Sequence, residues 1–292
     1  MSERLPILKT YKLYLGGAFP RTESGRTTVV EDAQGQARAH LCRASRKDFR
    51  NAVVVARKAQ PGWAGRSAYN RGQILYRMAE MLEGKSAEFV GALSATVPGG
   101  AERARREVES SVDRLVAFAG WSDKYQQILG CQNPVEGPFH NFSLPEATGV
   151  LALVAPNEQA LLGLVSLLAP ALCAGNTVVA LGSELHPLAT AIFAEVCATS
   201  DVPAGVVNLL TGQRAELLEQ FASHRDVDGI SAASCSADEK RALELGAAEN
   251  LKRVHVLTLD EEQDWYDAAE RESPDTIESF VEIKTIWHPS AT

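Results

Sequence analysis

The sequence predicts an α/β protein. It should be built on a Rossmann-like, doubly wound parallel sheet, with N-terminal helices packed against it and a small separate β-sheet. Three observations lead to this class. Residues 149–187 read as a strand, a helix and a strand with short joints, which is a βαβ unit. Buried strands and helices then continue to alternate as far as residue 259. A further stretch, 278–288, alternates as a strand and lies beyond these units.

The predicted main sheet takes its strands from short apolar runs without the alternation of a half-exposed strand. These runs are residues 149–155, 177–181, 205–210, 227–231 and 253–259. Between them, apolar residues at helical spacing predict helices over 158–174, 188–198, 215–222 and 238–248. Gly175 should end the first of these helices, because glycine adopts a left-handed conformation without a Cβ clash.

The N-terminal part predicts a small antiparallel sheet followed by helices. The sheet should combine residues 11–19, 27–30 and 37–42. Ser45 and Asp48 have the spacing of a capping box, so a helix should begin there, and Pro61 should end it. Two more amphipathic stretches follow. The first is a helix over 70–82, and the second is one long helix or a broken pair over 101–129.

Composition excludes several classes of function. The net charge is −8, from 29 basic and 37 acidic residues, which argues against a nucleic-acid partner. Five scattered cysteines without a CxxC pair predict neither a disulfide framework nor a zinc site, and no metal site is expected. They fit a reducing compartment, so we expect a cytoplasmic protein. The most apolar segment, 160–174, is too short to span a bilayer, and residues 1–12 lack a signal-peptide core, so no membrane association is expected.

Particular stretches resemble the aldehyde dehydrogenase superfamily. Its cofactor domain is similar to GVLALVAPNE and PALCAGNTVVALGSE, and its N-terminal helices are similar to YNRGQILYRMAEML and SVDRLVAFAGWSDKY. The resemblance implies a cofactor-type domain over 1–131 and 148–260, and an oligomerisation segment over 132–147 and 276–292. The acidic loop 261–275 stands where the family has its catalytic domain. The chain thus resembles a truncated member, like the second unit of long two-unit aldehyde dehydrogenases, which lacks the catalytic region.

No catalytic residue is expected from this resemblance. The family's Cys nucleophile lies in the catalytic domain, and Cys173 and Cys197 lie on apolar helices as inert core thiols. Cys235 lies near the predicted cofactor edge, where a structural role is favoured over a reactive thiol.

The family's other catalytic groups are also replaced. Glu158 stands at the position of the oxyanion-binding Asn, where a carboxylate would repel the oxyanion. We expect Glu158 to act as a first-turn helix acid instead. Leu257 stands at the position of the general base. His255 is interpreted as a hydrogen-bonded residue of a buried strand and not as a base.

The cofactor positions are only partly kept. Leu181 replaces the Lys that contacts the ribose in the family, whereas Glu184 remains to accept from ribose hydroxyls. Pro156, Ser183 and Glu184 are therefore the candidate cofactor-binding residues, and they form a weak site. The loop 233–238 has lost both glycines of the family's pyrophosphate loop, and Asp238 adds negative charge. We expect no cofactor, or at most weak NAD(P) binding.

Two functional hypotheses follow. The first is a non-catalytic protein acting in assembly, as a homo-oligomer (dimer or higher) or with a complete aldehyde dehydrogenase. The second is an NAD(P)-binding oxidoreductase subunit of the family with a weak or rebuilt site around Glu158, Glu184, Cys235 and His255, whose activity would be NAD(P)-dependent aldehyde oxidation with a partner. Residues 280–288 should form the interface strand. Its more apolar face, formed by Val281, Ile283, Thr285 and Trp287, should be the buried one.

Overall fold

The computed structural model describes residues 7–96, 99–259 and 262–290. Four parts of the predicted organisation lie outside the described residues. They are the first six residues, residues 97–98 of the predicted cofactor-type domain, the junction at 260–261 between that domain and the acidic loop, and the last two residues of the oligomerisation segment. The predicted division into domains stays a prediction.

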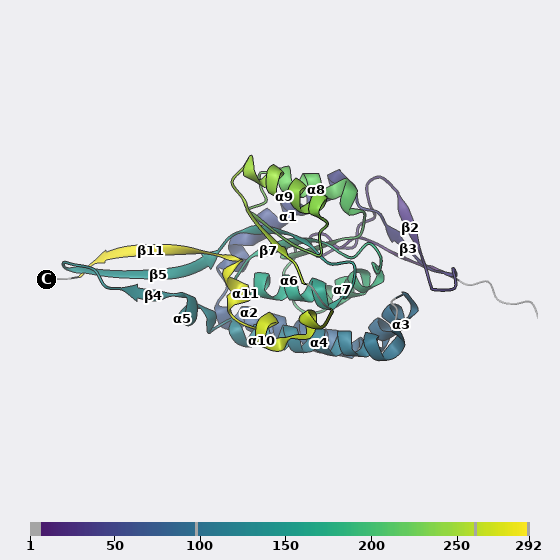
Figure 1. Cartoon of the computed structure of the whole chain (residues 1–292), viewed down its shortest axis with the longest axis horizontal. Helices are drawn as coiled ribbons and strands as arrows, with labels where there is room; N and C mark the ends of the chain where they lie inside the picture. Colours follow the sequence, from purple (N-terminus) through teal and green to yellow (C-terminus); the bar gives the residue numbers. More distant parts are fainter. Residues whose placement is uncertain (1–6, 97–98, 260–261, 291–292) are drawn as a thin grey trace, which may run out of the picture.

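The centre of the molecule is the expected parallel sheet (Figure 1). Its strands, in chain order, are β6 (Val150–Val154), β7 (Thr177–Leu181), β8 (Val207–Leu210), β9 (Gly229–Ala233) and β10 (Arg253–Leu257). The spatial order is β10-β9-β6-β7-β8, and every pairing is parallel. Strands β6, β7, β8 and β9 are buried at every residue, which is why their sequences do not alternate between apolar and polar residues.

Helices cover both faces of this sheet. On one face lie α6 (Leu162–Cys173) and α7 (Leu188–Ala198), and on the other lie α8 (Arg214–Ser223) and α9 (Ala237–Ala248) (Figure 1). The predicted doubly wound fold is therefore confirmed. Gly175 follows α6 with a φ of +94°, as expected for the residue that ends this helix.

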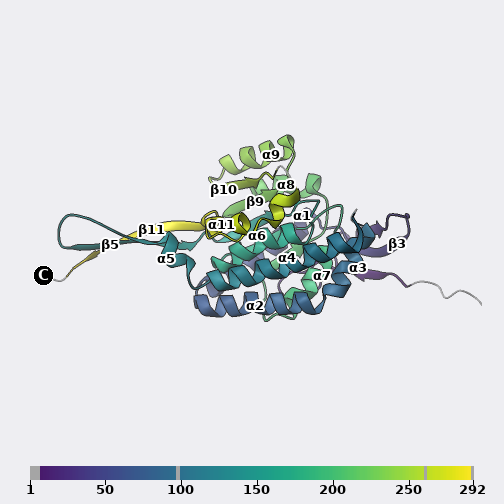
Figure 2. The same ribbon diagram turned by 60° about the horizontal axis from the view of Figure 1, so that its bottom comes forward.

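The N-terminal helices add a further layer. They are α1 (Arg46–Ala64), α2 (Ala68–Gly84), α3 (Ser86–Thr96), α4 (Gly100–Trp121) and α5 (Tyr125–Leu129). Helix α1 packs on β7 beside α8, whereas α2 and α4 pack on α6 (Figure 2). The capping box of Ser45 and Asp48 is present, and the stretch 101–129 is a broken pair. Helix α3 was not predicted.

Pro61 does not end α1, contrary to the sequence-based expectation. The helix continues for one more turn to Ala64. Trp63 lies in that turn with 1% exposure, and its Nε1 donates to the carbonyl of Leu172 at 3.2 Å. Burial of this indole offsets the hydrogen bond that the proline removes from the helix.

The N-terminal sheet is mixed and not antiparallel as predicted. Its strands are β1 (Lys9–Tyr11), β2 (Thr27–Glu31) and β3 (Ala37–Cys42). Strand β3 pairs antiparallel with β2 but parallel with β1. The alternating residues that follow residue 11 do not belong to this sheet as predicted. Tyr14 and Leu209 exchange backbone hydrogen bonds of 3.1 and 2.7 Å, so this segment crosses the edge of the main sheet at β8.

A separate antiparallel sheet protrudes from the body of the molecule (Figures 1 and 2). It contains β4 (Cys131–Asn133), β5 (Phe139–Ala147) and β11 (Val281–Pro289) in the order β11-β5-β4. The last strand thus joins the expected small sheet and not the parallel one. Within this chain, however, only Val281 of the predicted buried face is buried. Ile283 and Trp287 are 52% and 58% exposed, because no element that the structure describes packs over them.

The acidic connection between β10 and β11 is more ordered than the expected loop with a helical turn. It forms the 3₁₀ helix η1 (Glu262–Tyr266) and the short helices α10 (Ala268–Arg271) and α11 (Asp275–Glu278). Trp265 and Ile277 anchor it in the core, with 3% and 0% exposure. Across the described part of the chain, no helix has the length and apolarity needed to cross a membrane.

Candidate functional site

The strand order of the main sheet reverses between β6 and β9, and the carboxyl ends of these strands meet there. In open α/β sheets, ligands bind in the crevice at this point. The loop 155–161 follows β6, the loop 182–187 follows β7, and residues 234–236 connect β9 to α9. All three candidate cofactor-binding residues, Pro156, Ser183 and Glu184, lie in these loops. That these three residues bind a cofactor stays a prediction.

The crevice is filled by a residue that sequence analysis missed, Arg214. This first residue of α8 is 3% exposed. One of its terminal nitrogens donates to the carbonyls of Ala155 and Ala233 at 2.5 and 3.2 Å, and the other donates to the carbonyl of Ser234 at 3.0 Å. Its guanidinium thus joins the carboxyl ends of β6 and β9. A positive charge suits this position, because carbonyl oxygens converge there.

The acceptors on the β7 side are committed to the protein itself. One carboxylate oxygen of Glu184 accepts a hydrogen bond from the backbone N–H of Arg214 at the start of α8. The backbone N–H of Glu184 donates to Oδ1 of Asn157 at 3.0 Å. Ser183 is fully buried, and its hydroxyl donates to the carbonyl of Asn157 at 2.9 Å and accepts from the N–H of His186 at 2.9 Å. Glu184 therefore acts as a helix-terminus acceptor in this geometry.

The N-terminus of α9, where a pyrophosphate would be expected, carries its own cap. The Ser236 hydroxyl accepts from the N–H of Glu239 at 3.2 Å, and the Glu239 carboxylate accepts from the N–H of Ser236 at 2.8 Å. Asp238 adds a second carboxylate to this first turn. These groups satisfy amides that a phosphate needs, and their charge repels it. In this structure the Glu184 carboxylate, the carbonyls at the ends of β6 and β9 and the first amides of α9 are all hydrogen-bonded within the chain.

Glu158 does not have the predicted role. It lies exposed in the turn before α6, which begins only at Leu162. The acid at this helix N-terminus is Glu107 of α4, whose Oε1 accepts from the N–H groups of Leu161 and Leu162 at 2.8 and 3.2 Å. Burial raises the pKa of Glu107 above its ordinary value of 4.5, while these amides and the charge of Arg103 lower it. A buried acid 54 residues upstream carried no signal in the local sequence.

The cysteines near the sheet are poor nucleophiles. Burial raises the pKa of Cys173 to about 12 and also raises that of Cys197. Cys235 lies at the expected edge, half-buried after β9, and burial raises its pKa as well. A thiolate is the nucleophilic form, so none of the three thiols is activated.

Leu257 and His255, the two residues of β10 considered in the sequence analysis, make no hydrogen bond to a candidate catalytic side chain in the described structure. The carbonyl of Leu257 accepts from the N–H of Ser234 at 3.2 Å. His255 is exposed at the edge of the sheet and not in a buried strand as predicted, because β10 is an edge strand. Burial of part of its ring and the charge of Arg271 lower its pKa. Among the described residues, no cluster of His, Cys, Asp and Glu has the makings of a metal site.

The connection from β10 to β11 covers the outer face of α4 and α6. The guanidinium of Arg114 on α4, 1% exposed, donates to the carbonyl of Trp265 at 3.0 Å and pairs with Glu272 at 3.3 Å. Nε1 of Trp121 donates to the carbonyl of Glu272 at 2.7 Å. The Trp265 ring packs beside Gly163 of α6. This face therefore has a cover supplied by the chain itself.

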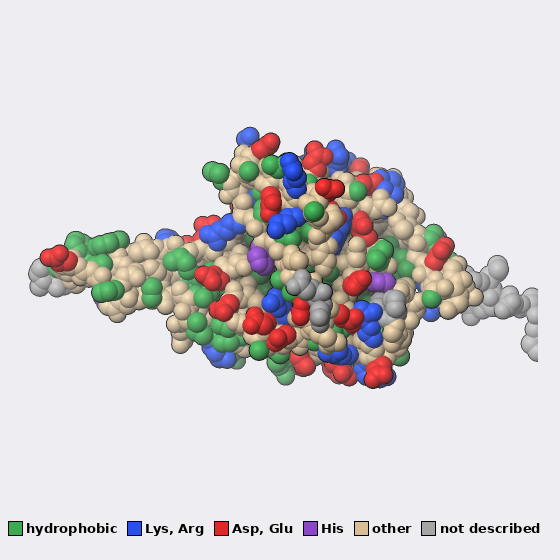
Figure 3. Space-filling model, in the orientation of Figure 1, with side chains coloured by type: hydrophobic (Ala, Val, Ile, Leu, Met, Phe, Trp, Pro, Cys, Tyr) green, Lys and Arg blue, Asp and Glu red, His purple; other side chains and the backbone are tan. Residues whose placement is uncertain are grey.

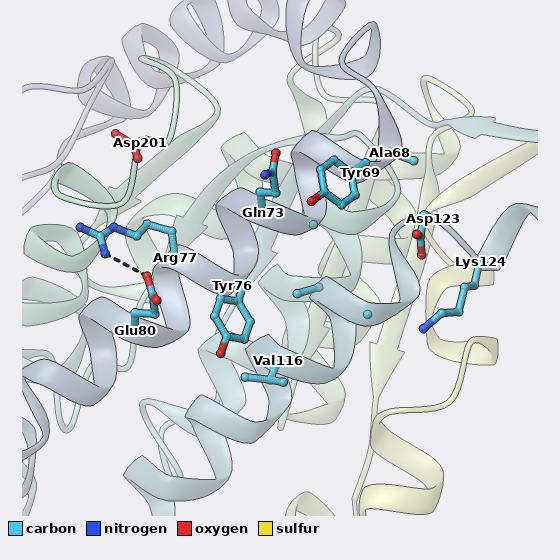
Figure 4. A pocket seen from close by; sticks show the side chains of 13 residues that line it. Ala68, Tyr69, Gln73, Tyr76, Arg77, Glu80, Val116, Asp123, Lys124 and Asp201 are labelled. Atoms are coloured by element: carbon cyan, nitrogen blue, oxygen red, sulfur yellow. Dashed lines mark hydrogen bonds and ion pairs between the residues drawn. The ribbon is translucent and has the colours of Figure 1, made fainter.

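A groove of about 650 Å³ lies elsewhere, between α2 and α4 (Figure 4). Tyr69 and Tyr76 of α2 and Val116 of α4 line it, and Arg77 is paired with Glu80 at 2.9 Å near one end. It belongs to the outer helical layer, away from the carboxyl ends of the strands. Asp123, Lys124 and Asp201 complete its charged lining.

Comparison with known proteins gives a consistent result. The model of the family described as "Aldehyde dehydrogenase family" matches residues 19–258. The mitochondrial benzaldehyde dehydrogenase of Antirrhinum majus is 32% identical over 85% of this chain and 47% of its own length. The cytosolic 10-formyltetrahydrofolate dehydrogenase of Mus musculus is 30% identical over 87% of this chain and 29% of its own length.

Solved structures agree in fold. A putative aldehyde dehydrogenase from Burkholderia cenocepacia superposes with a TM-score of 0.80 at 29% identity, covering 84% of this chain and 50% of that one. PnpE from Pseudomonas sp. WBC-3 superposes with a TM-score of 0.80 at 29% identity, covering 85% of this chain and 50% of that one. The structure of PnpE in complex with nicotinamide adenine dinucleotide gives a TM-score of 0.80 at 29% identity, with 84% and 50% covered. The chain spans about half the length of most of the relatives that it matches.

Proposed function

The chain belongs to the aldehyde dehydrogenase family, and from this premise we propose that it is a non-catalytic member acting in assembly. Its cofactor-type domain serves as a scaffold, and its protruding sheet binds another protomer. That protomer is a second copy of the chain or a complete aldehyde dehydrogenase.

The path of the chain supports the loss of the catalytic region. Strand β10 is followed by the short helices of the acidic connection and then directly by β11. In a truncated member of the family, this connection takes the place of the catalytic domain. Its buried Trp265 and Ile277 then cover apolar surface of α6 and its neighbours that the missing domain would leave bare.

The crevice supports the absence of dehydrogenase activity. Arg214 occupies the position between β6 and β9, Glu184 is bound to the start of α8, and the first turn of α9 is capped by its own acids. Cys235 is the thiol nearest to this edge, and its raised pKa keeps it protonated at neutral pH. Among the described residues, the crevice groups that a cofactor would use are paired within the chain, and the thiol nearest to them is not activated.

The observation that carries the assembly role is the unpartnered edge of β11. The strand pairs with β5 on one side, and in the described structure no strand pairs with its other side. Ile283, Trp287, Phe139 and Leu144 are exposed on this sheet, and apolar side chains are visible on the protruding arm in Figure 3. An exposed strand edge with apolar side chains favours pairing with another chain.

Weak NAD(P) binding is the second candidate. The 29% identity to PnpE, which was solved with nicotinamide adenine dinucleotide, favours it, as does the position of Ser183 and Glu184 at the end of β7. For binding to occur, Arg214 would have to leave the crevice and Glu184 would have to leave the α8 terminus.

Titration with NAD and NADP separates the two candidates. By calorimetry, we expect no saturable binding at dissociation constants below about 1 mM, with a complete family member as the positive control. We also expect no reduction of NAD or NADP in the presence of aldehydes. Micromolar binding, or turnover that disappears in Cys235→Ala, would establish the second candidate, whereas turnover that survives this substitution indicates a contaminant.

A further inference from the structure

A small pocket of about 240 Å³ lies between the β9–β10 edge of the sheet and the short helices α10 and α11. We propose that this edge pocket, lined by Ser231, His255, Leu257, Arg271, Thr276 and Ser279, binds a small monocarboxylate. Part of its wall comes from the acidic connection, which lies beyond the residues matched by the family model. The proposal is independent of the assembly role.

Ser231 and His255 form the strand side of the edge pocket. They are register partners on the parallel strands β9 and β10, so their side chains point to the same face of the sheet. Ser231 is only 1% exposed, and its hydroxyl has no hydrogen-bond partner in the described structure. A buried hydroxyl without a partner costs stability unless something satisfies it. An acceptor bound in the pocket would do so.

Arg271 provides the positive charge opposite these strands. Its side chain is 20% exposed, and its Nε is buried with no hydrogen-bond partner among the described groups. Its guanidinium has only a loose ion pair with the neighbouring Glu270, at 3.9 Å. An arginine fork with a free Nε–H matches the two oxygens of a carboxylate. Because the pKa of His255 is lowered, His255 is neutral at pH 7 and donates without adding a second charge.

The rest of the edge pocket limits the ligand. Glu270 and Asp275 are exposed at its rim, and their charges repel a second negative group. Leu167, Pro170 and Phe280 provide apolar wall for a short alkyl chain. A volume of about 240 Å³ is below that of typical sites for drug-sized ligands, so the ligand is small. One carboxylate on a short chain satisfies all these conditions, whereas a dicarboxylate or a phosphate dianion does not.

Propionate is the probe for this proposal. Amide shifts in nuclear magnetic resonance spectra of the full chain should change saturably with propionate, at a dissociation constant in the millimolar range. Succinate and inorganic phosphate should bind several-fold more weakly because of the acidic rim. Arg271→Gln should weaken propionate binding about tenfold, and Ser231→Ala about threefold. Arg241→Gln, which removes an exposed arginine on α9, is the matched control and should leave binding unchanged.

Three results would overturn the proposal. The first is an absence of saturable shifts up to about 100 mM propionate. The second is equal propionate binding by the Arg271→Gln, Ser231→Ala and Arg241→Gln variants. The third is phosphate binding as tight as propionate binding. Ser231→Ala changes a single buried atom, so it retains a folded test protein if Arg271→Gln loosens α10.

Discussion

The crevice at the carboxyl ends of the strands and the protruding sheet differ in whether their polar and apolar groups have partners within the chain. In the crevice, Arg214 donates to three backbone carbonyls, and Glu184 accepts from the start of α8. On the protruding sheet, Ile283 and Trp287 are more than half exposed, and the outer edge of β11 has no pairing strand among the described residues.

This difference separates a closed region from an open one. The crevice has its polar groups and its space filled from within the chain, so binding a nucleotide there requires breaking existing hydrogen bonds. The protruding sheet has apolar area and backbone groups that only another molecule can cover. The proposed assembly role rests on this difference between the two regions.

Substituting one tryptophan from each region should give the largest difference in the free energy of unfolding. Trp265→Ala should lower the free energy of unfolding by about 3–5 kcal/mol, because a buried indole leaves a cavity beside α6. Trp287→Ala, the matched control on the protruding sheet, should cost less than about 1 kcal/mol in the monomer, since the ring is 58% exposed and meets Phe139 edge-on. Urea denaturation at low protein concentration measures both. Equal losses would show that the acidic connection does not stabilise the helical face.

Arg214→Ala tests the closed crevice. We expect a loss of about 2–4 kcal/mol in unfolding free energy, because the carbonyls of Ala155, Ala233 and Ser234 lose their donor together. Arg46→Ala is the control, since its pair with Glu219 is exposed at 3.6 Å and should contribute less than about 0.5 kcal/mol. A loss as small as that of the control would mean that Arg214 does not hold β6 and β9 together.

A smaller effect is expected from the buried carboxyl of Glu107. Burial raises its pKa in the folded state above 4.5, so the folded protein keeps a proton that the unfolded chain has lost. Stability should therefore fall as the pH rises from about 4.5 through the folded-state pKa. Glu107→Gln keeps an acceptor for the Leu161 and Leu162 amides but cannot titrate, so this part of the decline should disappear in denaturation curves at several pH values. Glu109→Gln, on the exposed side of α4, should retain the wild-type slope.

The main sheet was predictable because its signals are local. Strands buried on both faces are continuous apolar runs, and Gly175 marks the end of α6 within one residue of its place. The strand order that brings β6 beside β9 is a long-range feature, and no local signal predicted it. The crossing of Tyr14 to Leu209 was not predictable, since the two residues lie almost two hundred positions apart in the chain.

The content of the crevice could not be read from the sequence. Arg214 resembles any charged residue at a helix start until the fold brings it to Ala155 and Ala233. The same is true of Glu107, which takes the place at the start of α6 that had been assigned to Glu158. Both are buried charges whose partners lie in other elements, and local patterns do not report such partners.

The mass of the protein in solution tests the assembly claim most directly. Light scattering after size exclusion should give at least twice the chain mass of 31.5 kDa for the wild type alone. Alternatively, the chain mixed with a complete aldehyde dehydrogenase should elute as a joint complex of the two proteins. Ile283→Glu combined with Trp287→Glu should abolish either complex without unfolding the chain, since both side chains are exposed. Leu251→Glu, which changes a 92% exposed leucine beside β10, should leave the complex intact. A wild-type chain that remains a monomer both alone and in the mixture would contradict the account.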